Sequence, residues 1–421
     1  MWKVDVIGKY MKIKVLISFL VIVLTFPSIG QWLNIKIGET VYWWATNCLL
    51  LFSFIAYKIK YNKYIPKLPI QIKLFMVYVI LSAVYGCFMA ESYWDWKLLI
   101  NNFMIYLMPM CFYYVSISAN LPIIIRRWCK FAIVAFWLLL PIMQFEAPGK
   151  FMIPFSFLII FWPFIKGKWR YIIFFFFLTI FIFGTLGARS SVIRYLVCAV
   201  FSICFIYPQI FKKKVLKSIS FIFLLSPIIL FILGVTNVFN VFKIDEYLDI
   251  NENEYEVQNA YGEKGEKESL TADTRTFLYL ETISSSLNHN YFIQGHSLAR
   301  GYESPWFRST DLTSYSRGER DASEVSILNI YTYMGIIGVV LYFMIFLGAV
   351  AYVFKYSQNY MMYVIACIVA FRWSFAWLED FTRFDLNNLF LWIMISMCYS
   401  PYFLKMNNNQ FRLWIKTLLY N

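Results

Sequence analysis

The amino-acid sequence predicts an all-α, polytopic membrane protein with about 12 transmembrane helices and one large extracytoplasmic loop between helices 9 and 10. Of its 421 residues, 60% are hydrophobic, 21% are aromatic and only 15% are charged, which is not the composition of a soluble single-core domain. The apolar residues form stretches close to the ~20 residues that a helix needs to cross a bilayer. Because these stretches lack period-2 alternation, helices are favoured over a membrane barrel.

The predicted spans follow one another along the chain with short connections. They lie at approximately 13–30, 40–57, 69–90, 98–118, 129–146, 151–165, 171–188, 190–207, 219–240, 326–347, 361–378 and 386–404. This pattern divides the chain into residues 1–240 with helices 1–9, the extracytoplasmic loop 241–325, and residues 326–421 with helices 10–12 and a cytoplasmic tail.

Lysine and arginine are concentrated in alternate connections. These basic residues are Lys3, Lys9, Lys12, Lys14, Lys58, Lys60, Lys63, Lys67, Arg126, Arg127, Lys130, Lys166, Lys168, Arg170, Lys212, Lys213, Lys214, Lys217, Lys355, Lys405, Arg412 and Lys416. The positive-inside rule then predicts that both termini are cytoplasmic and that residues 241–325 lie outside. The net charge of +14 is thus mainly a topology signal, and no basic soluble face suggests a nucleic-acid partner.

The loop 241–325 differs in composition from the rest of the chain, since it holds 16 of the 24 acidic residues and both histidines. Its first part, 245–270, is acidic and reads as a mobile surface loop. Residues 271–288 predict an amphipathic helix on the membrane face, because an apolar residue recurs at helical spacing. That stripe consists of Phe277, Leu280, Ile283 and Leu287. The remainder predicts an ordered loop that leads into helix 10 and carries binding chemistry.

Arginines near the outer face are the first candidates for binding an anionic substrate. Arg189 and Arg194 stand at the outer end of helices 7 and 8, where each either snorkels to the interface or binds an anion. The loop adds Arg275, Arg300, Arg308, Arg317 and Arg320. Each of these is either a solvated surface charge or part of a shared anion site; we select Arg189, Arg275, Arg300, Arg317 and Arg320 as candidate substrate-binding residues.

Glu324 and His296 are the candidates for a catalytic base. Glu324 stands where the loop re-enters the membrane, a position that also suits an acid at a helix N-terminus. His296 lies between Gly295 and Gly301, which allow the backbone to approach a ligand closely, although a lone histidine is more often structural. The chain therefore offers two alternative bases.

A cluster of charges between helices 11 and 12 lies on the same predicted face. Glu379 and Asp380 either line the substrate cavity or form surface pairs with Arg383, and Asp385 belongs to the same group. Arg372, within helix 11, is costly in lipid, so we expect it to pair with one of these acids. No Cys/His spacing indicates a metal site, none of the eight cysteines lies in 241–325, and no cofactor is expected.

The layout resembles the O-antigen polymerase and O-antigen ligase superfamily of bacterial cell-surface polysaccharide assembly. GARSS, which contains Arg189, is similar to the family's Ser/Arg element, and TRTFLYLE, with Arg275, to its Arg-bearing amphipathic helix. IQGHSLARG resembles the Gly-rich turn that follows, and ILNIYTYMGIIG, with Gly335 and Gly338, the entry into the next helix. In topology the resemblance covers most of the chain, whereas its motifs cover only about residues 184–194 and 271–341.

The resemblance implies metal-independent, inverting glycosyl transfer on undecaprenyl-diphosphate-linked saccharides at the bacterial inner membrane, in lipopolysaccharide biosynthesis. Arginines would bind the diphosphate, and a base would deprotonate a hydroxyl of the acceptor saccharide. A chain-length regulator and membrane lipids are the further partners expected. Ligase-type members carry a His-Asn pair where Glu324 and Val325 stand here, twelve positions before Gly335 counted inclusively, which favours a polymerase over a ligase.

Two hypotheses from other functional classes are also compatible with the sequence. A polysaccharide flippase or other transporter would show two related halves and charges paired deep in the spans, and neither is evident in the sequence. A non-catalytic receptor or assembly scaffold would use the loop 241–325 as a partner-binding face. Substitution of Arg189 or Arg275 distinguishes the enzyme hypothesis from these two, because only an enzyme would lose polymer formation.

Overall fold

The computed structural model describes residues 4–35, 37–144, 147–183, 189–243, 256–258, 267–269, 273, 275–305 and 318–420. Within these, only the backbone is described for 4–11, 180–183, 189–190 and the segments 256–258 and 267–269. The acidic segment predicted as a mobile loop at 245–270 therefore lies mostly outside the described residues.

Within the described residues the protein is all-α, with two short pairs of antiparallel strands. The α-helices are α1 (Val4–Val23), α2 (Thr25–Ile29), α3 (Thr40–Tyr61), α4 (Ile70–Met89), α5 (Tyr93–Tyr106), α6 (Phe112–Val115), α7 (Leu121–Leu139), α8 (Ala147–Phe151), α9 (Ile153–Ile160), α10 (Gly167–Phe183), α11 (Arg189–Ile203), α12 (Lys213–Val235), α14 (Thr276–Asn288), α16 (Ser326–Tyr356), α17 (Tyr360–Phe375), α18 (Leu386–Tyr399), α19 (Pro401–Leu404) and α20 (Asn408–Thr417). Short 3-10 turns are η1 (Gly30–Trp32), η2 (Met108–Cys111), η3 (Leu140–Ile142) and η4 (Trp162–Phe164). The strands are β1 (Glu256–Gln258), β2 (Lys267–Ser269), β3 (Tyr302–Glu303) and β4 (Glu319–Arg320), with β1 paired to β2 and β3 to β4.

Six helical segments of the described chain are long and apolar enough to cross a membrane, which indicates a multi-pass membrane protein. They are Lys12–Trp32, Thr40–Tyr61, Ile70–Met89, Tyr93–Val115, Lys213–Val235 and Ser326–Tyr356. Helices α3, α4 and α12 expose large apolar side chains such as Phe52, Leu81 and Ile222, whereas every residue of α18 is buried. A helix bundle with apolar side chains on its outside is the arrangement expected in lipid.

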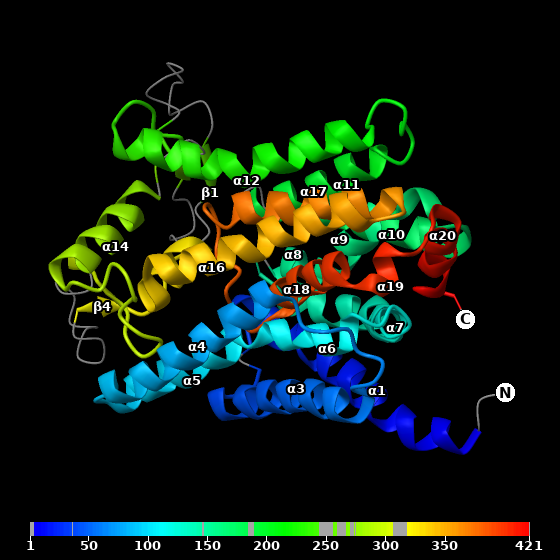
Figure 1. The fold of residues 1–421 in the computed structure, drawn as a ribbon, viewed down its shortest axis with the longest axis horizontal. Coiled ribbons are helices and arrows are strands. Elements are labelled where there is room, and N and C mark those ends of the chain that lie inside the picture. The colour runs from blue at the N-terminus through cyan, green and yellow to red at the C-terminus, as the bar shows by residue number, and fades with distance from the viewer. Residues whose placement is uncertain are drawn as a thin grey trace.

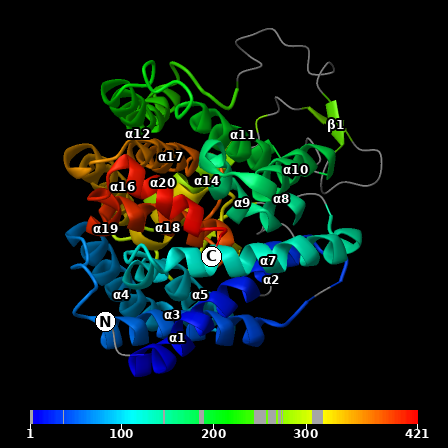
Figure 2. The same ribbon diagram turned by 90° about the vertical axis from the view of Figure 1, so that its right-hand side faces the viewer.

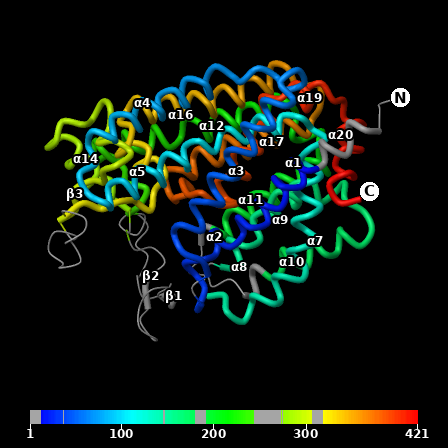
Figure 3. The backbone as a smooth tube through the Cα atoms, turned by 90° about the horizontal axis from the view of Figure 1, so that it is seen from below, coloured from blue at the N-terminus to red at the C-terminus, as the bar shows by residue number. Residues whose placement is uncertain are grey.

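The long helices lie side by side along the long axis of the molecule (Figure 1). Figures 1 and 3 place α14 and the β3–β4 pair at one end of this axis, and the start of α1 together with α20 at the opposite end. The helix from the predicted extracytoplasmic loop and both ends of the described chain are therefore on opposite sides of the bundle.

The structure departs from the predicted spans in the middle of the chain. The span predicted at 129–146 is instead α7, which begins at Leu121 and runs across the long axis (Figures 2 and 3). Arg126 and Arg127, which the prediction placed in a connection, lie inside this helix. They are accommodated there because they donate to the carbonyl of Thr417 and the hydroxyl of Ser18. The segment 151–165 contains the end of α8, then α9 and the 3-10 turn η4, and the 8 residues of α9, about 12 Å long, are too short to cross a membrane.

Candidate functional site

Three charged side chains predicted as site residues meet at the α14 end of the bundle. Arg275 Nη1 donates to Glu324 Oε2 over 2.6 Å, and Arg320 Nη2 donates to Glu324 Oε1 over 3.4 Å. The side chain of Glu324 is 54% exposed, while those of Arg275 and Arg320 are 25% and 19% exposed. The carboxylate thus bridges two guanidinium groups at an accessible position.

Separate elements hold these three residues in place. Arg275 immediately precedes α14, where Asp273 accepts hydrogen bonds from the backbone N–H groups of Arg275 and Thr276. Arg320 lies in β4, opposite Tyr302 of β3. Glu324 stands two residues before α16. The cluster therefore depends on the packing of α14, the strand pair and α16 against one another.

An apolar groove begins next to Arg275. It is lined by Ser226, Pro227, Leu230, Phe231, Gly234, Val235, Asn240, Val241, Phe242, Thr276, Tyr279, Leu280, Ile283, Ser374, Trp377 and Leu378. The groove has a volume of about 210 Å³. Arg275 Nε donates to the carbonyl of Leu378 over 3.2 Å, so this guanidinium is attached to the groove wall. Arg275 therefore lies at the edge of an apolar surface, and Glu324 joins it to a second guanidinium group, that of Arg320.

The apolar stripe predicted on α14 is present, but it is not the face that packs against the protein. Phe277, Leu280 and Leu287 are 48%, 62% and 59% exposed, and Ile283 lies in the groove wall. The packed face instead carries Leu278, Tyr279, Thr282, Ser285 and Ser286. Burial in the protein is therefore achieved by a face with several hydroxyls, while the apolar stripe remains available to lipid or to a lipid-like ligand.

Glu379 lies in a second, less accessible group of charges. Arg194 Nη2 donates to both carboxylate oxygens of Glu379, over 3.3 and 3.2 Å, and Lys150 Nζ donates to Oε1 over 3.3 Å. Arg194 is only 3% exposed, so the interfacial snorkelling considered from the sequence does not describe it. The backbone carbonyl of Glu379 accepts from Ser326 at the start of α16.

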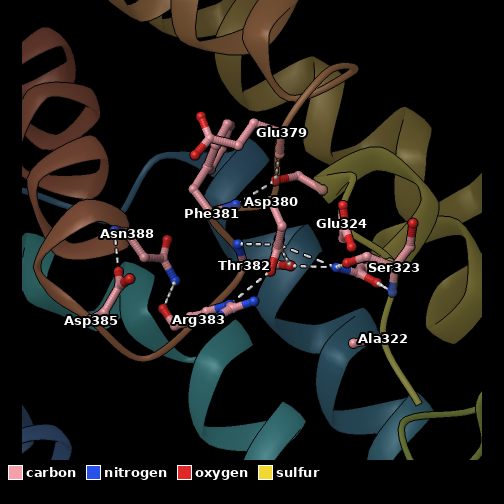
Figure 4. Close-up of polar contacts among 12 residues, drawn as sticks. Ala322, Ser323, Glu324, Glu379, Asp380, Phe381, Thr382, Arg383, Asp385 and Asn388 are labelled. Atoms are coloured by element: carbon pink, nitrogen blue, oxygen red, sulfur yellow. Dashed lines mark hydrogen bonds and ion pairs between the residues drawn. The ribbon is translucent and has the colours of Figure 1, made fainter. Parts of the chain in front are cut away.

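Asp380 is buried and held by polar groups from two chain segments. Its Oδ1 accepts from Asn329 Nδ2 over 3.2 Å and from the backbone and hydroxyl of Thr382, while Arg383 Nε donates to its Oδ2 over 3.1 Å. Figure 4 shows the side chains of Glu379 and Asp380 pointing in different directions from neighbouring positions of this loop. Their carboxylates therefore do not converge on one point with Glu324.

The prediction that Arg372 pairs with an acid is wrong. Within the described residues its Nη2 donates to Asn387 Oδ1 over 2.8 Å, and the guanidinium lies 4.3 Å from the centre of the Phe381 ring. A neutral amide and an aromatic face stabilise the buried cation in place of a carboxylate. The nearest acids in sequence are instead occupied by Lys150, Arg194 and Arg383.

His296 lies in a stack of rings in the loop after α14. Its ring is parallel to those of Tyr291 and His289, with centroids at 4.5 and 6.4 Å. Nδ1 lies 2.7 Å from the carbonyl oxygen of Gly301 and must donate to it, which leaves Nε2 as the basic nitrogen of the neutral ring. Burial lowers the pKa of His296, so the neutral form is favoured at neutral pH.

Arg300 is engaged in a pair of its own. Its Nε donates to both carboxylate oxygens of Glu319, over 3.2 and 3.1 Å, and Nη2 also donates to this carboxylate. The same carboxylate accepts from the backbone of Gly301, and it is the main cause of a raised pKa for Arg300. This pair attaches the loop that follows α14 to β4. Arg300 therefore does not take part in the contacts of Arg275 and Arg320 with Glu324.

Two predicted substrate-binding arginines are not placed by the structure. Arg317 lies outside the described residues, as does Arg308. Arg189 is the first residue of α11, and only its backbone is described. The described side chains contain no cluster of three or more His, Cys, Asp or Glu residues suited to a metal ion.

Two glycines allow the loop with His296 to pack against α16. The helix is interrupted at Gly335, where φ is +60° and ψ is −165°, and Gly295 has φ of +81°. The backbone N–H groups of Ile336 and Ile337 donate to the carbonyls of Phe292 and Ile293, and that of His296 donates to the carbonyl of Thr332. The glycines beside His296 therefore serve an approach between two segments of backbone.

Replacing Gly335 with alanine is expected to lower the free energy of unfolding by about 2–4 kcal/mol. A Cβ at this position would lie 2.2 Å from the carbonyl oxygen of Ile293, and a positive φ is unfavourable for alanine. Thermal unfolding of the purified protein measures the effect. Gly30→Ala is the matched control, because a Cβ there meets nothing within 4 Å and φ is −55°. Equal stability of the two variants would contradict this account of the interruption.

Residues that the sequence analysis did not select complete these networks. Lys150 donates to Glu379 and Asn329 to Asp380, both in the connection between α17 and α18. Ser326 accepts from the backbone of Phe381 and donates to the carbonyl of Glu379. A single amide within an otherwise apolar helix, as in SILNIYTY, is the signal that could have identified Asn329, because a buried amide requires partners.

No family model, curated protein or solved structure matches the chain.

Proposed function

We propose that this protein is an integral-membrane glycosyltransferase that polymerises undecaprenyl-diphosphate-linked oligosaccharide repeats on the outer face of the bacterial cytoplasmic membrane. The observation that carries this proposal is that Arg275, which Glu324 joins to Arg320, donates a hydrogen bond to the wall of the apolar groove. A prenyl diphosphate combines an apolar chain with an adjacent anion, which is the combination that groove and arginines suit.

The groove and the arginines divide the substrate between them. Aromatic and aliphatic side chains such as Phe231, Tyr279 and Trp377 provide the surface for the prenyl chain. Arg275 and Arg320 provide guanidinium groups, which bind phosphate oxygens through bidentate hydrogen bonds. As the bond to the sugar breaks, negative charge grows on the leaving diphosphate, and fixed guanidinium groups stabilise it.

Glu324 is the proposed general base. A diphosphate that binds Arg275 and Arg320 replaces the carboxylate as their partner, and this frees Glu324 to accept a proton. The acceptor hydroxyl then loses its proton to Glu324, its oxygen bonds to the anomeric carbon with inversion, and the anomeric C–O bond to phosphate breaks. Undecaprenyl diphosphate leaves with the bonding electrons. His296, with Nε2 basic, is the alternative base.

An O-antigen ligase is the alternative function, since the same chemistry would transfer finished polymer to a different acceptor. Glu324 stands where ligase-type members have a histidine, which favours polymerisation. A flippase or transporter is less well supported, because the accessible cluster of Arg275, Arg320 and Glu324 is built beside α14 and β4, which lie at one end of the bundle (Figure 1). Inner-membrane location with cytoplasmic termini fits the placement of α1 and α20 at the opposite end.

Deletion of the protein is expected to leave a single repeat attached to the lipid A core and to remove the long polysaccharide ladder. Gel profiles of surface polysaccharide from the deletion strain and the parent measure this. Polymer that accumulates on the lipid carrier while the core stays bare would instead identify a ligase. Repeats trapped on the cytoplasmic side would identify a flippase, and normal polymer on the core would exclude every function proposed above.

A further inference from the structure

A second cavity lies inside the bundle, between α9, α11, α17 and α18. It is lined by Ile153, Ser156, Phe157, Ile160, Arg194, Cys198, Ile368, Phe371, Arg372, Asn387, Phe390, Leu391 and Met394. The cavity has a solvent-accessible volume of about 20 Å³, which is room for one water molecule or one ion of similar size. It is distinct from the groove beside Arg275, with which it shares no lining residue.

Two buried guanidinium groups line this cavity with N–H donors to spare. Arg194 and Arg372 are each 3% exposed. Arg194 Nε and Nη1 and Arg372 Nε have no hydrogen-bond partner among the described residues. Arginine has five N–H donors and no acceptor, so a group that satisfies these atoms must be an acceptor. An unsatisfied buried donor costs about 1–3 kcal/mol, and more when it is charged.

The charges at the cavity favour an anion over a water molecule. Arg194 has the carboxylate of Glu379, which also accepts from Lys150. Arg372 contacts the amide of Asn387 and the ring of Phe381, and no carboxylate of the described residues forms an ion pair with it, although Glu379 acts on its charge at longer range. A water molecule would accept hydrogen bonds but would leave the buried charge of Arg372 without a counter-ion in direct contact.

We propose that this cavity binds one small monovalent anion, chloride in the cell, held by Arg194 and Arg372. The size of the cavity excludes phosphate, carboxylates and sugars, so the site does not belong to the glycosyl-transfer substrate. The bound anion provides the counter-charge that fixes both guanidinium groups between α11, α17 and α18. This site is independent of the proposed function, because it would be occupied whatever reaction the outer cluster performs.

The direct test is retention of radioactive chloride by the purified full-length protein in lipid nanodiscs at pH 7. About one chloride per chain is expected, competed by bromide and not by gluconate, which is too large for the cavity. The thermal unfolding midpoint should also rise with chloride relative to gluconate at the same ionic strength, because a ligand that binds only the folded state stabilises it. Wild-type protein that retains no chloride and unfolds at the same temperature in both salts would mean that the cavity holds only water, and would overturn the proposal.

Two variants assign the binding to this cavity. Arg372→Gln is expected to lose most of the retained chloride and the chloride-dependent shift, even if its stability in gluconate is lower. Arg412→Gln on α20 removes an arginine that does not line the cavity and whose guanidinium lies over the ring of Phe164, so this variant should retain chloride as the wild type does. Should Arg372→Gln fail to fold, the retention by wild type and by Arg412→Gln remains the deciding result; should it fold and retain wild-type chloride, the assignment to this cavity is wrong.

Discussion

Substitution of Arg275 by glutamine is expected to abolish the long polysaccharide ladder while the protein stays folded in the membrane. Loss of one preorganised donor to a developing oxyanion typically lowers the rate by about 10²–10³-fold, and Arg275 also anchors the edge of the groove. The Arg275–Glu324 pair is partly solvent-exposed, so its loss should cost less than about 1 kcal/mol of stability. The experiment compares the gel profile of surface polysaccharide with the amount of protein in the membrane.

Three further variants test whether the loss comes from phosphate binding. Arg275→Lys keeps the charge but not the planar fork, so it should restore little of the ladder. Arg189→Gln should resemble Arg275→Gln if both arginines hold the diphosphate. Arg412→Gln, at the opposite end of the bundle, should leave the ladder unchanged. A full-length ladder from Arg275→Gln at normal protein levels would exclude this arginine from the site.

The sequence predicted the class of fold because the signals for membrane helices are local. Apolar length alone located the helices at Thr40–Tyr61 and Ile70–Met89 to within a few residues of their ends. It failed for α7, where Arg126 and Arg127 read as a connection between spans. These arginines are tolerated inside the helix because they contact α20 and α1, which are distant in sequence. Local pattern cannot reveal partners that folding brings together.

The candidate site was predicted residue by residue, but its grouping was not. Arg275 and Glu324 are separated by 49 positions, and only the packing of α14 against the start of α16 brings them into contact. For Arg372 the need for a partner followed from its position inside a predicted membrane span, yet the partner is Asn387 and not an acid. Either type of side chain satisfies a guanidinium N–H group, so chemistry without geometry could not choose between them.

Substitution of Glu379 by glutamine is expected to act on stability more than on catalysis, although the residue was predicted to bind substrate. The side chain is 13% exposed and accepts from Arg194 and Lys150, which are 4% and 14% exposed. Removing one partner of a buried ion pair leaves uncompensated charge and costs about 3–5 kcal/mol. We therefore expect a large drop in the thermal unfolding midpoint of the purified protein.

Glu324→Gln is the matched comparison, because it removes the same charge from a carboxylate that also bridges two cations but is 54% exposed. Its unfolding midpoint should stay close to that of the wild type while polymer formation is lost. Lys150→Met in the Glu379→Gln background removes one of the uncompensated cations and should recover part of the lost stability. If Glu379→Gln instead retains wild-type stability and loses the ladder, Glu379 is a substrate ligand and the catalytic site extends from Glu324 across the α17–α18 connection to α11.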